Sequence, residues 1–258
     1  MNAIADVQSS FDKRNLPINQ VGVKGLRLPV RIASSSGEQA TIAELTMTVA
    51  LPATQKGTHM SRFVELMEGY EGVIDSVGLR YLTETMLIRL QAEAGKISLT
   101  CPFFRRKQAP VSGISSWLDY QLVMSGEVRE GSYHAFLQIM VPVTSLCPCS
   151  KEISAYGAHN QRSHVTVSLT CHDATVDIEE IIDLIENQAS CQLYGLLKRP
   201  DEKFVTEHAY DNPKFVEDIV RDIATALKAD KRIHEFTVES ENFESIHNHS
   251  AYAVIQYP

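Results

Sequence analysis

Apolar residues recur along the chain with two different periods, and these predict strands and helices in succession. In residues 25–32 and 40–51, apolar and polar side chains alternate, which is typical of half-buried strands. From Ser61 onward the apolar positions recur every three or four residues, which predicts two amphipathic helices. We expect Ser61 to cap the first helix and the second helix to end near Gly95.

The second half of the chain shows the same succession of patterns. Asn212 and Pro213 form a helix start signal, a capping side chain followed by a proline at the first helical position. The predicted strands of the whole chain, beyond the two above, are residues 97–104, 116–130, 132–143, 163–172, 234–241 and 252–257, and the predicted later helices are residues 178–188 and 213–227.

Each half therefore reads as strand, strand, helix, helix, strand, strand. The short connections favour antiparallel pairing, so we expect an α+β fold with antiparallel sheets and the helices gathered on one face. We expect an extended arm over residues 1–20, a first module over 21–130 and a second module over 131–258. The exposed edges of such sheets favour pairing with other subunits in a closed oligomeric barrel.

Composition and charge narrow the possible functions. The chain has 24 Lys and Arg against 32 Asp and Glu, a net charge of -8, which disfavours binding to a nucleic acid polymer. No run of about 18 apolar residues is present, and the first twenty residues lack a basic segment followed by an apolar one. We therefore expect a soluble cytoplasmic protein whose five cysteines are thiols rather than a disulfide framework.

The densest reactive cluster lies between two predicted strands of the second half. It contains Cys147 and Cys149 around a proline, and His159 follows twelve residues after Cys147. A thiolate and an imidazole both bind zinc or another divalent metal. A catalytic metal site needs a third protein ligand and an open position, whereas a structural zinc site needs four protein ligands. The stretch of residues 199–208 and the pair His247 and His249 are the candidates for the missing ligand.

Six short motifs, in this order, resemble those of the GTP cyclohydrolase type IB family. They are residues 16–23 (LPINQVGV), 56–63 (KGTHMSRF), 148–154 (PCSKEIS), 158–162 (AHNQR), 198–203 (KRPDEK) and 246–249 (IHNH). The resemblance runs from about residue 7 to the end of the chain. It implies the tunnelling fold, with two ββααββ modules in each subunit, and a tetramer whose active sites lie between subunits.

The resemblance also assigns roles to individual residues. It implies that one divalent metal per site, zinc or manganese and also iron, is held by Cys147, His159 and Glu202. Cys149 and His247 would lie beside the reacting carbon. The substrate-binding residues that it implies are Glu217 at the guanine edge, and His59, Arg62, Lys203 and His249. Three further cations, Arg105, Arg106 and Lys107, are candidates for the triphosphate, although they also fit an ordinary solvated strand end.

The implied reaction is the hydrolytic opening of the guanine imidazole ring of GTP by a metal-activated water. It yields 7,8-dihydroneopterin triphosphate and formate, the first step of tetrahydrofolate biosynthesis. Two other readings remain open at this point. One is a tunnelling-fold nitrile reductase, which uses a cysteine nucleophile and NADPH and needs no metal. The other is a non-enzymatic oligomeric module with a structural zinc.

Overall fold

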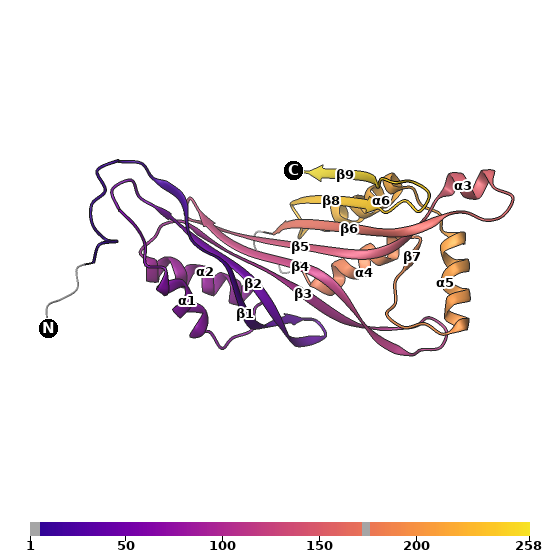
Figure 1. The fold of residues 1–258 in the computed structure, drawn as a ribbon, viewed down its shortest axis with the longest axis horizontal. Coiled ribbons are helices and arrows are strands. Elements are labelled where there is room, and N and C mark those ends of the chain that lie inside the picture. Colours follow the sequence, from indigo (N-terminus) through magenta and orange to yellow (C-terminus); the bar gives the residue numbers. More distant parts are fainter. Residues whose placement is uncertain (1–5, 172–175) are drawn as a thin grey trace. The chain divides into compact units, whose positions relative to one another are not determined.

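Antiparallel strands form most of the regular structure in the computed structural model, which describes residues 6–171 and 176–258 (Figure 1). Within these residues the strands form one sheet in the order β1-β2-β3-β4-β5-β6-β8-β9, and β7 pairs with β5 beside this path. The first elements are β1 (Ile18–Ser34), β2 (Gly37–Leu51), α1 (Ser61–Glu68), α2 (Ser76–Leu90), β3 (Gly95–Gln108), β4 (Ser115–Arg129) and β5 (Ser132–Leu146). The later elements are α3 (Pro148–Ile153), β6 (Asn160–Cys171), α4 (Ile178–Gln188), β7 (Cys191–Gln192), α5 (Arg199–Asp211), α6 (Val216–Ala229), β8 (Glu235–Asn242) and β9 (Ala251–Tyr257). The predicted α+β class with an antiparallel sheet is confirmed.

The chain divides into two compact units. The first consists of residues 1–101 and 123–136, and the second of residues 102–122 and 137–258. No helix within the described residues is long and apolar enough to cross a membrane. The predicted strand over residues 163–172 corresponds to β6, and its last residue, His172, lies outside the described residues.

The core of the first unit follows from the alternation of apolar residues in β2. From Thr41 onward every second residue of β2 is buried, and Leu45 and Met47 pair with Leu99 and Ile97 of β3. The buried side chains that complete this core come from the two helices, Phe63, Leu66 and Met67 from α1 and Leu79, Leu82, Met86 and Leu90 from α2. Each fully buried Leu, Ile or Phe stabilises the fold by about 1.5–3 kcal/mol.

Two predicted helix ends in this unit are wrong. Met60, with helical backbone angles, precedes α1, so Ser61 is the first helical residue and not its cap. α2 ends at Leu90 because Gln91 adopts a left-handed conformation, in which its N–H bonds to Ile88 and Leu87. Gly95 instead begins β3, where a Cβ atom would lie 2.7 Å from the backbone oxygen of Thr48. The glycine thus permits close strand packing.

The second unit is built on the apolar faces of α4 and α6. Both helices bury apolar residues at helical spacing, and α6 packs against β8 and β9. These residues are Ile178, Ile181, Ile182 and Ile185 of α4 and Val216, Ile219, Val220, Ile223 and Leu227 of α6. The predicted helix over residues 178–188 is confirmed with the same bounds.

The predicted start of the last helix is wrong, and a helix before it was not predicted. Asn212 is the C-cap of α5, and α6 begins only at Val216 after Phe215. The backbone N–H of Lys214 donates to the oxygen of Leu146 at 3.0 Å, which keeps the chain extended between the two helices. α5 was not predicted because it buries only Asp201 and Ala209 and so has no apolar stripe.

Candidate active site

Cys147 and His159 are held together where β5 ends and β6 begins. The backbone N–H of Cys147 donates to the oxygen of His159 at 3.1 Å. Ser150 bridges the same two residues, because its hydroxyl donates to the Cys147 oxygen at 3.1 Å and accepts from the His159 N–H at 3.2 Å. The N–H of Ser150 also points to the Cys147 sulfur at 3.5 Å. Three hydrogen bonds to backbone atoms and one weaker contact to the Cys147 sulfur therefore hold the two residues beside each other.

A cavity of about 480 Å³ in the second unit brings half of the ten predicted site residues together. Five of them line it: Cys147, His159, Glu217, His247 and His249. The rings of His247 and His249 stack with their centroids 5.0 Å apart. These side chains come from the β5–β6 connection, the start of α6 and the β8–β9 connection, segments that are far apart in sequence. The cavity thus joins sulfur, imidazole and carboxylate groups at one place.

The Glu217 carboxylate is positioned by the start of α6. Phe215 precedes this helix, and its N–H donates to the Asp218 side chain at 2.9 Å, which caps the helix. The bond from Lys214 to Leu146 then places the start of α6 beside Cys147. Glu217 is exposed in the cavity, so its carboxylate is available to accept hydrogen bonds from a ligand.

His159 has two polar neighbours that were not predicted. Its Nδ1 lies 2.9 Å from Oε1 of Gln161 and 3.7 Å from Oε2 of Glu244. Gln161 and Glu244 also line the cavity. Gln161 stands inside the motif of residues 158–162, so the resemblance pointed to its neighbourhood, whereas no sequence pattern marks Glu244. Ser150 was likewise missed, although it lies in the motif of residues 148–154.

Three predicted residues of this unit do not line the cavity in the described part of the chain. Cys149, on α3, is exposed. Glu202 and Lys203 are exposed on the first turns of α5, where Lys203 pairs with Glu207 at 3.8 Å. α5 itself is anchored by the buried side chain of Asp201.

Asp201 holds the start of α5 against the turn between β3 and β4. Its carboxylate accepts from the N–H of Val111 and of Ser112 and from that of Lys198, each at 2.8 Å, and from the Ser112 hydroxyl at 2.6 Å. Burial alone raises the pKa of this carboxyl, but the hydrogen bonds from Ser112, Lys198 and Val111 outweigh it and lower the pKa. Asp201 is therefore an ionised structural anchor beside the exposed Glu202.

His59 and Arg62 lie in the first unit. His59 Nε2 is 3.3 Å from a carboxylate oxygen of Asp6, and Arg62 donates to the backbone oxygen of Arg89 at 3.0 Å. The contact from Arg62 ties α1 to the end of α2. The structure thus gives both residues partners within their own unit.

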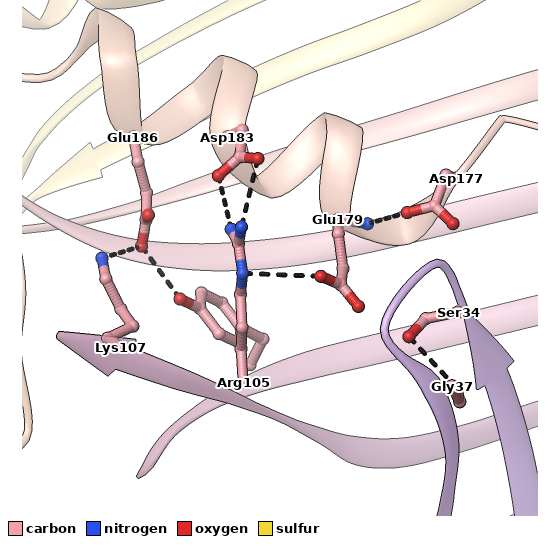
Figure 2. Close-up of polar contacts among 9 residues, drawn as sticks. Ser34, Gly37, Arg105, Lys107, Asp177, Glu179, Asp183 and Glu186 are labelled. Atoms are coloured by element: carbon pink, nitrogen blue, oxygen red, sulfur yellow. Dashed lines mark hydrogen bonds and ion pairs between the residues drawn. The ribbon is translucent and has the colours of Figure 1, made fainter. Parts of the chain in front are cut away.

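Arg105 and Lys107 form ion pairs with α4 (Figure 2). Arg105 binds both oxygens of Asp183, at 2.5 and 3.1 Å, and lies 3.6 Å from Glu179. Lys107 contacts Glu186 at 2.6 Å, and both side chains are almost fully buried. Carboxylates of this chain thus pair with both of these candidate cations.

Arg106 points to the other face of β3. Its guanidinium lies over the ring of Trp117, 4.7 Å from the centroid, and the residue is exposed. Neighbouring residues of one strand alternate in direction, which separates this cation from the two that contact α4. Arg106 therefore remains accessible to solvent.

The donor atoms of the cavity fit part of a divalent metal site. Cys147 and His159 supply a sulfur and a nitrogen, the ligand types that zinc prefers, and hydrogen bonds hold the two residues together. Among the described residues of this single chain, no three His, Cys, Asp or Glu side chains form a group that could hold a metal ion. A metal held by Cys147 and His159 would therefore need a further ligand that the described residues of one chain do not place beside them.

Solved structures show which fold this chain shares. It is similar to a uricase from Bacillus fastidious, with a TM-score of 0.52 and 11% identity over 95% of this chain and 94% of that one. It is also similar to the uricase from Arthrobacter globiformis, with a TM-score of 0.50 and 10% identity over 92% and 93% of the two chains. At this identity the likeness concerns the fold alone.

Sequence relatives are much closer. GTP cyclohydrolase FolE2 of Neisseria gonorrhoeae is 69% identical over 258 residues, which is the full length of both chains. GTP cyclohydrolase FolE2 2 of Cupriavidus metallidurans is 56% identical over 252 residues, covering 98% of this chain and 94% of that one. The family described as Type I GTP cyclohydrolase folE2 matches residues 4–253. The chain therefore belongs to the type I GTP cyclohydrolase FolE2 family.

Proposed function

We propose that this protein is a GTP cyclohydrolase that hydrolyses GTP to 7,8-dihydroneopterin triphosphate and formate. The observation that carries the proposal is that Cys147, His159, Glu217 and His247 line one cavity in a chain of this family. These four side chains provide the groups needed to bind a divalent metal, to recognise a purine edge and to transfer protons.

We infer that Cys147, His159 and Glu202 hold the catalytic metal, which is zinc, manganese or iron. Sulfur, imidazole and carboxylate ligands together suit these ions. When bound, the metal supplies a Lewis acid that lowers the pKa of water and so makes hydrolysis feasible near neutral pH. The exposure of Glu202 on α5 is consistent with its carboxylate reaching a site in a neighbouring subunit.

The other predicted site residues have separate tasks in this proposal. Glu217 accepts hydrogen bonds from two N–H donors of the guanine ring, which orients the purine. Cys149 and His247 transfer protons beside the carbon that leaves as formate, because a positioned thiol or imidazole can act as a general acid and base. His59, Arg62, Lys203 and His249 are the proposed contacts of the rest of the substrate.

We propose that the chain has the tunnelling fold, with two modules in each subunit, and works as a homotetramer with active sites between subunits. In the described residues, β1 and β9 end the order of strands in the sheet, so each has one edge without a strand partner in this chain. Such edges pair readily with strands of another copy. A tetramer would also supply the third metal ligand that the single chain lacks.

The proposal is tested with metal-stripped protein and GTP. We expect no fluorescent pterin from the stripped protein and restored formation on adding zinc or manganese. Cys147→Ser and His159→Asn should abolish the restoration, whereas Gln138→Leu, on β5, should leave it intact. Full activity of the stripped protein refutes the metal requirement. If GTP is not consumed with any metal, the structural zinc reading is favoured, and oxidation of NADPH with a nitrile substrate would point to a reductase.

Glu217→Gln tests substrate recognition separately. An amide presents an N–H group to the guanine donors and loses one of the two acceptors, so we expect KM for GTP to rise about tenfold or more, in line with the 1–3 kcal/mol cost of an unsatisfied polar group. Metal binding should be unchanged in this variant. An unaltered KM would remove Glu217 from the proposed guanine site.

A further inference from the structure

A chain of buried polar side chains leads from the sheet to the imidazole of His159. The Ser163 hydroxyl donates to the Ser145 hydroxyl at 2.9 Å. Nε2 of Gln161 donates to the same Ser145 oxygen at 2.8 Å, and Oε1 of Gln161 lies 2.9 Å from Nδ1 of His159. Ser145 and Ser163 are fully buried, and Gln161 is 7% exposed. This chain of hydrogen bonds thus begins at buried residues of the core and ends at the cavity.

The Gln161 amide lies between Ser145 and His159, with one end toward each of them. Its NH2 group is directed to Ser145, so its carbonyl oxygen is the atom that faces His159. A carbonyl oxygen can only accept a hydrogen bond, so Nδ1 of His159 must carry a proton and donate it. In a neutral imidazole the lone pair is then on Nε2.

We propose that Gln161 is a positioning residue that fixes the tautomer of His159 and thereby leaves Nε2 free to bind the divalent metal. This inference rests on the proposed role of His159 as a metal ligand. A histidine that binds a metal through one nitrogen commonly donates its other N–H to an oxygen, which fixes the orientation of the ring. Gln161 supplies that oxygen without adding a charge to the site.

Glu244 is the other group that faces Nδ1, and its position is less favourable. The distance of 3.7 Å to its Oε2 is longer than a normal hydrogen bond, whereas the 2.9 Å contact to Gln161 is ideal. Gln161 is also held from behind by Ser145, which is fully buried. The amide therefore dominates the choice of tautomer.

The first measurement is the tautomer of His159 in the metal-free protein. With 15N-labelled histidine at a pH of about 8, above the ordinary pKa of about 6.5, the two ring nitrogens give distinct NMR shifts. The His159 signal is assigned by its loss in His159→Asn. We expect the Nδ1–H form in the wild type and in Gln161→Glu, which keeps an oxygen acceptor, and a mixture with the Nε2–H form in Gln161→Leu.

The second measurement is the affinity for Zn²⁺ and Co²⁺, determined by competition with a chromophoric chelator. We expect Gln161→Leu to weaken metal binding by about 10- to 100-fold, and Gln161→Glu to stay within about threefold of the wild type. The matched control is Gln138→Leu, because the Gln138 amide also donates to a serine, Ser168, at 2.9 Å but does not line the cavity. It should bind both metals as the wild type does.

The outcomes separate this inference from the proposed function. An Nε2–H form in the wild type, or unchanged affinity in Gln161→Leu while His159→Asn loses the metal, overturns the positioning role. Wild-type affinity in His159→Asn overturns the proposed metal site instead, and the tautomer measurement then still decides whether Gln161 controls the ring. If Gln161→Leu does not fold, Ser145→Ala removes the contact that orients the amide, and the same shift in tautomer is expected there.

Discussion

Replacing Glu186 with Gln tests the buried ion pair between β3 and α4. Glu186 and Lys107 have side chains only 1% and 7% exposed, and the Tyr120 hydroxyl donates to the same carboxylate oxygen at 2.9 Å. The amide keeps the shape and an acceptor for Tyr120 but leaves the Lys107 ammonium buried without its counter-charge. Removing one partner of a buried pair costs about 3–5 kcal/mol.

The ionisation of Lys107 sets an upper limit to this cost. Burial already lowers the pKa of Lys107, and Glu186 opposes that effect. Without Glu186 the lysine can lose its proton, and from an ordinary pKa of about 10.4 this costs about 4.6 kcal/mol at pH 7 but about 1.9 kcal/mol at pH 9. We therefore expect Glu186→Gln to destabilise the protein by about 3–4.5 kcal/mol at pH 7, and by less than about 2 kcal/mol at pH 9.

The sign of the pH dependence follows from the direction of the shift. The pKa of Lys107 in the folded variant lies below its unfolded value, so the unfolded state binds more protons between the two values. The stability of the variant relative to the wild type then rises with pH. At pH 7 the melting temperature should fall by about 6–18 °C, since about 2–4 °C corresponds to 1 kcal/mol in a chain of this size.

The assay is thermal unfolding followed by circular dichroism at a fixed protein concentration, because self-association would shift the midpoint. Glu207→Gln, which breaks the exposed pair with Lys203, is the control and should change stability by less than about 1 kcal/mol. Adding Lys107→Met to Glu186→Gln removes the stranded charge and should recover much of the loss. A cost below about 1 kcal/mol that is equal at pH 7 and pH 9 would refute the reasoning, since it would mean that water reaches Lys107.

Three further predictions concern other contacts. Asp201→Asn should lower the melting temperature at neutral pH. Because the pKa of Asp201 is depressed in the folded state, its contribution to stability is present above an unfolded pKa of about 3.9 and is lost as the pH falls below that value. The melting curves of the wild type and the variant should therefore converge in acid. Gly95→Ala should lower the free energy of unfolding, measured in urea, by about 1–3 kcal/mol, because the added Cβ would lie 2.7 Å from the Thr48 oxygen. An unchanged urea midpoint would show that β2 and β3 can move apart at this position without a cost in stability. Ser150→Ala should weaken zinc binding in a chelator competition while lowering stability by only about 1–2 kcal/mol, and equal zinc affinity would contradict its role in holding Cys147 beside His159.

Periodic apolar residues explain what could be predicted of the fold. The isoleucines of α4 recur at helical spacing and are all buried, so the pattern determined the bounds of that helix. α5 has no such stripe, and its start depends on the hydrogen bonds that Asp201 makes to Ser112, 89 residues away. The start of α6 was misplaced because the Asn212–Pro213 signal is overridden by the bond from Lys214 to Leu146.

The same distinction applies to the site. The motif residues Cys147 and His159 were predicted together, and the structure places them together. Their geometry depends on Ser150 and Gln161, whose hydrogen bonds cannot be derived from spacing alone. The ion-pair partners of Arg105 and Lys107 were missed for a related reason, because these carboxylates on α4 lie 78 and 79 residues further along the chain. Long-range partners of polar residues leave no periodic trace in one sequence.

The bond between the N–H of Lys214 and the oxygen of Leu146 has a consequence for how this chain tolerates changes in length. Cys147 follows one end of that bond directly, and Glu217 follows the other end by three residues. Their separation therefore depends on this short path rather than on the long stretch between β7 and α6. Changes in length within the connection of residues 193–197 should leave the distance between the thiol and the carboxylate unchanged, as long as residue 214 still pairs with the end of β5.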